Sequence, residues 1–322
     1  MAFMLQCDHV TKKVGNFLLW DIHFDLEPGY ILGIIGSNGA GKSTLMRILL
    51  GSYKLYNHTE DCKCRTIEAE WMAANKGDVF LNGASIRRNP REYKNQTAFV
   101  MNDSPFALGM SARDNGLAYG RYYGDFDFIR YEKLCREYGV SYNTVLKKLS
   151  KGEQIKQQLA FAMSHSACLY ILDEPAGNLD IQFREEFYEI MRDIVKDGDK
   201  SIIYVSHLVE EMDVLADYIL WIEKGKQKSY GTLEELLDQY RLYSGPQGFL
   251  RSKEGYEVIG LQKKENHTEA LVWSQNGCFS GQVKSRSRRA ALKEIMYYEK
   301  ESEEQVCRKQ TVRPNLPVER RG

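Results

Sequence analysis

Residues 30–51 read YILGIIGSNGAGKSTLMRILLG, and this stretch decides the fold. Residues 31–35 form a short apolar run rich in β-branched side chains, which is typical of a buried parallel strand. Residues 42–50 repeat apolar side chains at helical spacing and so predict a helix. The segment between them, Gly36-Ser-Asn-Gly-Ala-Gly41-Lys42-Ser43, matches the pattern G-x-x-x-x-G-K-[ST] of a phosphate-binding loop. The stretch therefore predicts a strand, a glycine loop and a helix in direct succession.

The glycine loop has the chemistry of a nucleoside-triphosphate site. Its glycines let the backbone curl so that successive N–H groups point at phosphate oxygens, and the start of the helix adds further N–H groups. Lys42 supplies positive charge for the terminal phosphates, and the Ser43 hydroxyl is placed to ligate Mg²⁺. A glycine-rich turn with an accidental lysine is the alternative, but the flanking strand and helix argue against it. We assign nucleotide binding to Gly36, Ser37, Asn38, Gly39, Ala40, Gly41, Lys42, Ser43 and Thr44.

A second buried strand carries the next candidate residues. Residues 168–172 are apolar and are followed directly by Asp173 and Glu174. A carboxylate at the position of Asp173 can hold the hydration shell of Mg²⁺ beside the phosphates. Glu174 points elsewhere and can activate a water on the γ-phosphate as a general base. A strand that ends in a solvated acidic turn is the alternative, which we would favour without the glycine loop.

Residues 149–154, Leu-Ser-Lys-Gly-Glu-Gln, resemble the signature L-S-G-G-Q of the ATP-binding cassette (ABC) ATPases. Other motifs of that family follow in the family's order. Residues 178–180, Asn-Leu-Asp, are similar to its D-loop, and His207, after the apolar run 201–206, is similar to its switch histidine. Each short match is weak alone. Five matches in order make a strong resemblance, which covers residues 1 to about 235.

The resemblance implies the cofactors of the site and the roles of its residues. ATP and Mg²⁺ are the expected cofactors, with Ser43, Asp173 and Asn102 as the metal-binding residues. Glu174 and His207 are the expected catalytic residues, and His207 senses the γ-phosphate. Two cassettes of this family pair head to tail, so that each signature contacts the ATP held by the partner's loop. The signature residues are Ser150, Lys151, Gly152 and Glu153.

Several positions depart from the family pattern. Asn102 is the nearest match to the family's glutamine and is one methylene shorter. Val14 stands where the adenine-stacking aromatic of the family usually lies, so stacking is lost unless Phe17 replaces it. Lys151 and Glu153 replace a glycine and a glutamine of the signature, and Glu153 adds negative charge near ATP. These differences bear on turnover and nucleotide affinity rather than on the fold.

Composition and charge narrow the alternatives. The 322 residues include 44 Lys and Arg against 44 Asp and Glu, so no global field favours nucleic acid as a partner. The sequence shows no transmembrane span and no secretory signal, and seven scattered cysteines are typical of reduced thiols. We expect a cytoplasmic chain, peripheral on the inner face of the cell membrane. A zinc site at His58, Cys62 and Cys64 lacks a clear fourth ligand and is not favoured.

Alternating strands and helices predict an α/β fold of the P-loop NTPase class with a mostly parallel sheet. We expect the nucleotide-binding domain over residues 1–235, with an insertion at about 52–76 and a helical subdomain at about 103–165. Residues 241–300 are expected to form a small C-terminal α+β accessory domain. Residues 301–322 hold few large apolar side chains and are expected to be a flexible tail.

The predicted function is that of the ATP-hydrolysing subunit of an ABC transporter whose membrane-spanning permease is a separate chain. The segment that ends near residue 298 is similar to the small end domain of bacterial exporter-type cassettes, which favours export over import. The partner cassette is a second copy or another ABC chain. The alternatives are a soluble ABC ATPase of DNA repair or translation and a P-loop kinase. Soluble ABC ATPases of that kind carry a coiled-coil insertion or two cassettes, and a P-loop kinase would not explain the signature.

Overall fold

The computed structural model describes residues 3–55, 75–250, 255–279 and 281–311. Contacts divide the chain into two compact units, Met1–Thr232 and Leu233–Gly322. The predicted insertion at about 52–76 lies mostly outside the described residues, together with His58, Cys62 and Cys64. No helix in the described part of the chain combines the length and the apolar character that a membrane span requires.

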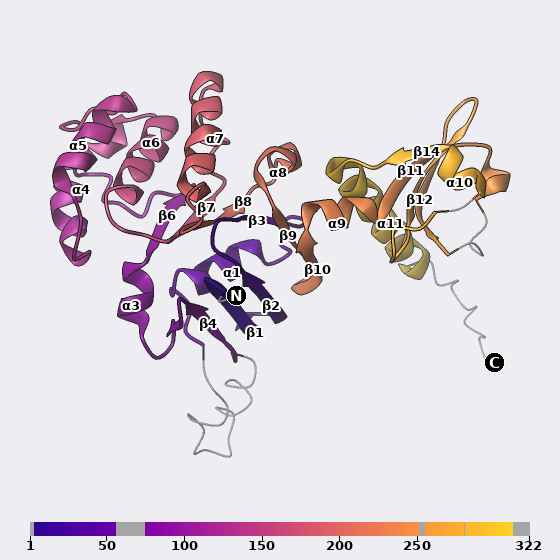
Figure 1. Ribbon diagram of the computed structural model, residues 1–322, viewed down its shortest axis with the longest axis horizontal. Coiled ribbons are helices and arrows are strands. Elements are labelled where there is room, and N and C mark those ends of the chain that lie inside the picture. The colour runs from indigo at the N-terminus through magenta and orange to yellow at the C-terminus, as the bar shows by residue number, and fades with distance from the viewer. Residues whose placement is uncertain (1–2, 56–74, 251–254, 280, 312–322) are drawn as a thin grey trace, which may run out of the picture. The chain divides into compact units, whose positions relative to one another are not determined.

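The first unit is built on one ten-stranded sheet (Figure 1). Its strands are β1 (Leu5–Val14), β2 (Phe17–Leu26), β3 (Ile31–Ile35), β4 (Asp78–Leu81), β5 (Ala84–Ser85), β6 (Thr97–Met101), β7 (Leu169–Asp173), β8 (Ser201–Val205), β9 (Tyr218–Glu223) and β10 (Lys226–Thr232). Their order across the sheet is β5-β4-β1-β2-β10-β9-β3-β8-β7-β6. The run β9-β3-β8-β7-β6 is parallel, whereas β1, β2, β4 and β5 pair antiparallel.

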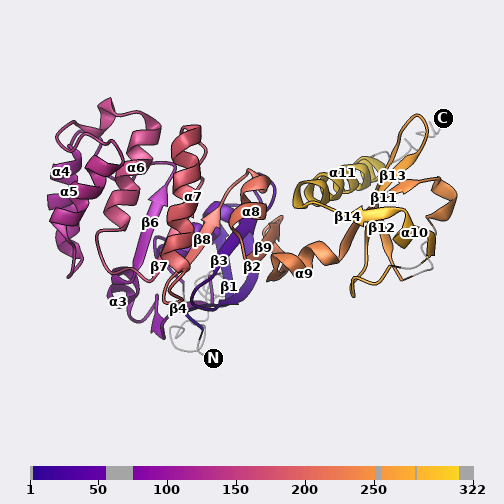
Figure 2. The same ribbon diagram turned by 45° about the horizontal axis from the view of Figure 1, so that its top comes forward.

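Helices cover the parallel strands and continue beyond β6. They are α1 (Lys42–Leu49), α3 (Pro90–Asn95), α4 (Ala112–Tyr119), α5 (Phe128–Glu137), α6 (Lys151–Ala162), α7 (Ile181–Val195) and α8 (Val209–Leu215), with short 3₁₀ turns at Gly120–Tyr122 and Leu146–Lys148. Figure 2 shows α4, α5 and α6 as a group beside β6. That group falls within the predicted helical subdomain at about 103–165. The α/β fold of the P-loop class predicted from the sequence is confirmed.

The parallel strands explain where a site can form. Every residue of β3 and β8 is buried, as near-continuous apolar strands covered on both faces must be. Because β3, β6, β7 and β8 run in the same direction, their carboxyl ends meet at one edge of the sheet. Ligands of open α/β sheets bind at that edge. The glycine loop follows β3. Of the other predicted site residues, Asn102 follows β6, Asp173 and Glu174 lie at the end of β7, and His207 comes after β8.

The second unit is a four-stranded antiparallel sheet with flanking helices. Its elements are α9 (Leu233–Asp238), β11 (Tyr240–Gly245), a 3₁₀ turn (Gln247–Phe249), β12 (Glu257–Lys263), β13 (Thr268–Trp273), α10 (Gly281–Ser285), β14 (Ser287–Arg289) and α11 (Leu292–Thr311). The strand order is β12-β13-β11-β14. Residues 301–311 were expected to be tail and instead continue α11, so the helix extends past the point where large apolar residues stop. The rest of the predicted tail lies outside the described residues.

Candidate nucleotide site

The glycine loop between β3 and α1 adopts a backbone that only glycine supports comfortably. The φ angles of Gly36 and Gly41 are 150° and 118°. A Cβ at Gly36 would lie 2.0 Å from the carbonyl oxygen of Ile222, and one at Gly41 would lie 2.8 Å from Leu19 Cδ1. The contact at Gly36 is with backbone and is too close for any side chain, whereas a side chain at Gly41 would require Leu19 to shift and would be strained by the φ angle. The loop therefore depends on glycine for its shape and its close fit to the sheet.

Lys42 is held over this loop. Its Nζ donates hydrogen bonds to the carbonyl oxygens of Gly36, at 2.6 Å, and of Ser37, at 3.0 Å. Burial lowers the pKa of Lys42, and the nearby carboxylates of Glu174, Glu223 and Asp173 oppose that shift. The ammonium group beside the loop is thus partly desolvated. Its attraction to a phosphate is therefore stronger than it would be in bulk water.

Glu223 at the end of β9 accepts a hydrogen bond from the glycine loop, and it was not among the predicted site residues. The hydroxyl of Ser37 donates to Glu223 Oε1 at 2.5 Å. The signal was present, because residues 218–223 form an apolar run ended by a carboxylate, as residues 169–173 do. Only the neighbouring positions of β9 and β3 in the sheet reveal that this carboxylate faces the glycine loop.

The acidic pair after β7 faces the loop. Burial raises the pKa of Asp173, the charge of Glu174 raises it further, and Lys42 opposes the shift. Glu174 has a φ of 48°, which is uncommon for a residue with a side chain, and its N–H donates to Val205 O at 2.8 Å. His207 Nδ1 lies 3.2 Å from Glu174 Oε1. The two predicted catalytic residues are therefore neighbours.

A cavity of about 650 Å³ collects the oxygen donors predicted to hold the metal. The three predicted metal ligands, Ser43, Asn102 and Asp173, line it, and the predicted base Glu174 lines it too. Hydroxyl, amide and carboxylate oxygens are the ligands that Mg²⁺ accepts, usually with several waters and the phosphates of a nucleotide. The donor set of this cavity therefore fits Mg²⁺ bound together with a triphosphate.

Asn102 is fixed from two sides. Asn178 Nδ2 donates to Asn102 Oδ1 at 3.2 Å. The amide of Gln158 brackets the preceding residue, accepting from Met101 N at 2.9 Å and donating to Met101 O at 3.0 Å. Gln158 is fully buried in α6 and was not predicted as a positioning residue. Its signal in the sequence is a glutamine on the apolar face of a helix, where it must find backbone partners.

The signature residues begin α6. Ser150 is the N-cap, with its hydroxyl accepting from Glu153 N at 3.2 Å, while Glu153 Oε2 accepts from Ser150 N at 2.7 Å. This reciprocal capping box gives a structural reason for glutamate at a position where the family has glutamine. A Cβ at Gly152 would lie 2.7 Å from Asn178 O, so the start of α6 touches the D-loop. Lys151 Nζ lies 4.0 Å from Asp103 Oδ1.

None of the four signature residues lines the 650 Å³ cavity beside the glycine loop. Asp180 is also directed elsewhere, because it caps α7 through Phe183 N at 2.8 Å and pairs with Lys156 at 3.2 Å. Phe17 lies beside the loop, since a Cβ at Gly41 would be 3.0 Å from its ring. Phe17 is therefore an aromatic residue that lies close to the glycine loop, although Val14 occupies the position of the family's aromatic residue.

Comparison with known proteins places this geometry in a family. Residues 19–177 match the family described as ABC transporter. The chain belongs to the ABC transporter family. Within it, the chain is an ATP-binding, ATP-hydrolysing protein, as the glycine loop and acidic strand end predicted. The matched segment contains the glycine loop, the signature and the acidic pair.

Relatives with several named roles are similar in sequence to about three quarters of this chain. The chain is 25% identical over 240 residues to ABC transporter ATP-binding protein YtrB of Bacillus subtilis, covering 74% of this chain and 75% of that protein. It is 29% identical over 248 residues to the ribose import protein RbsA of Caldanaerobacter subterraneus, covering 73% and 46%. It is 27% identical over 248 residues to Nod factor export ATP-binding protein I of Sinorhizobium fredii, covering 73% and 64%.

A solved structure supports the fold. A dimeric ATP-binding cassette, MJ0796, in a post-hydrolysis state bound to ADP and Pi, matches with a TM-score of 0.59 at 18% identity. The match covers 71% of this chain and 99% of that one. The fraction of this chain that is left over corresponds in size to the second unit, Leu233–Gly322.

Proposed function

We propose that this chain is the ATP-hydrolysing subunit of an ABC exporter, acting at the cytoplasmic face of the membrane with a permease on separate chains. The observation that carries the proposal lies at the edge of the parallel sheet. Asp173 and Glu174 line one cavity there together with Ser43 of the glycine loop. Lys42 is hydrogen-bonded to that loop, and His207 lies 3.2 Å from Glu174. Export rather than import is inferred from the likeness of the C-terminal unit to the end domains of exporter-type cassettes. The relatives include proteins named for import and for export.

The chemistry follows from the placement of the side chains. Lys42 and the loop N–H groups bind the β- and γ-phosphates, and Ser43, Asp173 and Asn102 are the residues that would hold Mg²⁺. Bound Mg²⁺ supplies positive charge that neutralises the phosphate oxygens. Glu174 accepts the proton of the attacking water through its carboxylate. His207, 3.2 Å from Glu174 Oε1, orients that carboxylate and meets the γ-phosphate.

A second cassette completes the site in this proposal. The signature residues lie outside the chain's own cavity, at the exposed start of α6, where a helix N-terminus offers N–H groups to an anion. Ser150, Lys151, Gly152 and Glu153 would therefore contact ATP held by the partner. Because the signature and Asn102 are unusual, we propose a mixed dimer with another ABC chain, which native mass spectrometry of the complex would resolve.

We expect Ser150→Arg to block dimerisation without affecting ATP binding by the monomer. The arginine would place bulk and charge on the surface that meets the partner's nucleotide, while every residue of the chain's own cavity stays unchanged. ATP affinity should stay within about twofold, and the ATP-dependent dimer should disappear from size-exclusion chromatography. Ser141→Arg, on an exposed turn of the same unit, serves as the control. An equal loss of nucleotide binding in the monomer would contradict the shared site.

A second cavity offers a docking surface for the permease. It measures about 590 Å³, and its walls include Phe106, Tyr119, Tyr122 and Arg121. Phe99, Pro105, Tyr123 and Lys94 line both this cavity and the nucleotide cavity. An apolar permease helix bound in this cavity would therefore contact side chains that also line the nucleotide cavity. A movement of these side chains on ATP binding would reach the membrane subunits directly.

We expect Tyr122→Glu to release the chain from its permease. Tyr122 is 67% exposed, so the substitution should leave the fold intact while placing a carboxylate in an apolar groove. In detergent-solubilised membranes the parent should co-purify with a multi-span protein and the variant should lose it. Ile129→Glu is the matched control, because Ile129 is 84% exposed on α5 and does not line the groove. A parent that co-purifies with no membrane protein would favour the soluble ABC alternative.

A further inference from the structure

We propose that His9, Asp21 and His23 form a binding site for a divalent transition-metal ion, tested here as Zn²⁺. These residues lie on β1 and β2, in the antiparallel part of the sheet. One potential ligand atom from each of them lies within 4.8 Å of the others, and they are the one such group of three among the described residues. The ATPase cycle described above assigns them no role.

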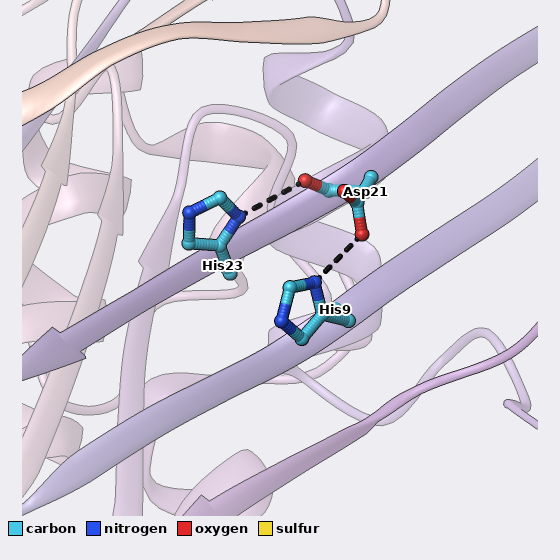
Figure 3. Close-up of side chains that lie close together, drawn as sticks. All are labelled: His9, Asp21 and His23. Atoms are coloured by element: carbon cyan, nitrogen blue, oxygen red, sulfur yellow. Dashed lines mark hydrogen bonds and ion pairs between the residues drawn. The ribbon is translucent and has the colours of Figure 1, made fainter.

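The geometry of the group converges on Asp21 (Figure 3). His9 Nδ1 lies 2.8 Å from Asp21 Oδ1, and His23 Nδ1 lies 3.3 Å from the main-chain oxygen of Asp21. The two imidazole rings stack with centroids 5.0 Å apart. Ligand atoms around a tetrahedral metal are about 3.4 Å apart when the bonds are about 2.1 Å long. Side-chain rotations that move each ligand atom by about an ångström are therefore enough to bring the three atoms around an ion.

An irregularity in the strands brings the three side chains together. The register of β1 with β2 shifts between Cys7 and Val10 and again between Val10 and Lys12. At these bulges His9 and Asp21 have φ angles of 47° and 54°. Bulges re-aim side chains that regular alternation would separate. The imidazole of β1 is thereby turned to meet the carboxylate and imidazole of β2.

The surroundings favour a cation. His9 and His23 line a cavity of about 660 Å³ whose other lining residues include Asp8, Asp25 and Glu27. Among the described residues that line this cavity there is no lysine or arginine. Because these three carboxylates line the cavity without a lysine or arginine beside them, the electrostatic potential in the cavity is negative. The side chains of His9 and Asp21 are 61% and 42% exposed, so an ion reaches them directly from solvent.

The donor set fixes the class of metal. Two imidazole nitrogens and one carboxylate oxygen suit Zn²⁺ and its first-row neighbours better than Mg²⁺ or Ca²⁺, which prefer oxygen alone. Three protein ligands leave a fourth position open to water, unlike the closed four-ligand sites of structural zinc. The site is thus distinct in chemistry from the oxygen-lined cavity beside the glycine loop.

The test is Zn²⁺ titration of the untagged full chain, without nucleotide, by isothermal calorimetry. We expect one Zn²⁺ bound by the parent and affinity reduced by about 100-fold or more in the double variant His9→Asn, His23→Gln. Loss of even a supporting residue of a metal site costs about 10- to 100-fold in affinity. Asparagine is chosen at position 9 because it tolerates positive φ. His267→Asn is the control, since His267 is an exposed histidine of the other unit, 3.8 Å from Glu269.

Two further readouts separate this site from other sources of binding. Zn²⁺ at about 100 times its dissociation constant should raise the melting temperature of the parent by on the order of 5 °C, and that of the double variant by much less. Co²⁺ should give a visible spectrum without the intense near-ultraviolet band that thiolate ligands produce. Unchanged Zn²⁺ affinity in the double variant, a thiolate band, or no binding by the parent would each overturn the proposal. ATP affinity of the double variant should equal that of the parent, which keeps this test independent of the proposed function.

Discussion

Glu174→Gln should abolish most ATP hydrolysis while leaving ATP binding nearly unchanged. Glutamine keeps the size and hydrogen-bonding shape of the side chain but cannot accept the proton of the attacking water. The residues proposed to hold the nucleotide, Lys42 and Ser43 with the loop backbone, are untouched. Loss of a general base lowers turnover by roughly 10²- to 10⁴-fold. With hydrolysis blocked, the closed dimer should persist and become visible by size-exclusion chromatography with Mg²⁺ and ATP.

We propose Glu174 as the base in preference to the other candidate carboxylates. Asp180 is occupied as the cap of α7 and the partner of Lys156, and Glu153 is occupied in the capping box of α6. Neither carboxylate lines the nucleotide cavity, whereas Glu174 does. Its φ of 48° is also uncommon for a residue with a side chain. Such unusual backbone conformations cluster at functional sites.

Turnover and affinity must be measured separately for this variant, at saturating Mg²⁺. The control is Glu137→Gln, because Glu137 is an exposed glutamate of α5 that pairs with Lys133 and does not line the nucleotide cavity. It should retain hydrolysis at a rate within an order of magnitude of the parent. Hydrolysis by Glu174→Gln at nearly the parent rate would assign the base elsewhere. Loss of both binding and hydrolysis, with a lowered melting temperature, would indicate a misfolded strand end.

The parallel half of the fold was predictable because its signals are local. Residues 31–35, 168–172 and 201–206 are short apolar runs, and the structure has strands at Ile31–Ile35, Leu169–Asp173 and Ser201–Val205. The glycine loop follows the first of these strands, so its position in the fold could be read directly. Continuous burial on both faces leaves a pattern that a single sequence displays.

Strands β1 and β2 of the antiparallel half were not predicted, and their bulges explain why. His9 and Asp21 lie in left-handed backbone within β1 and β2, which interrupts the alternation by which strands are recognised. Glu223 and Gln158 were missed for a different reason. Each acts on a residue far away in the sequence, Ser37 and Met101, through contacts that exist only once the strands are side by side. The local pattern marks each side chain as unusual but does not show which distant residue it will contact.

Lys42→Ala should remove most of the chain's affinity for ATP. Lys42 is the lysine bound to the glycine loop itself, at 2.6 and 3.0 Å from the carbonyl oxygens of Gly36 and Ser37. Its charge is partly desolvated, so its contacts with phosphate are stronger than those of a surface lysine. A charge-assisted hydrogen bond contributes roughly 1.5–3 kcal/mol, which corresponds to about a 10- to 100-fold fall in affinity. The measurement is ATP affinity by fluorescence or calorimetry.

The alanine variant also removes the two hydrogen bonds that Lys42 donates to the loop, so loss of charge must be separated from loss of loop shape. Lys42→Arg retains the charge and the donors but not the compact geometry of an ammonium group, and it should bind ATP with intermediate affinity. Lys133→Ala is the control for a lysine as such, because Lys133 is 73% exposed and pairs only at 3.5 Å with Glu137 on α5. ATP affinity in Lys42→Ala equal to that of Lys133→Ala would exclude this loop as the nucleotide site. A fall that Lys42→Arg partly restores would show that the cation over the loop, rather than the glycines alone, binds the terminal phosphates.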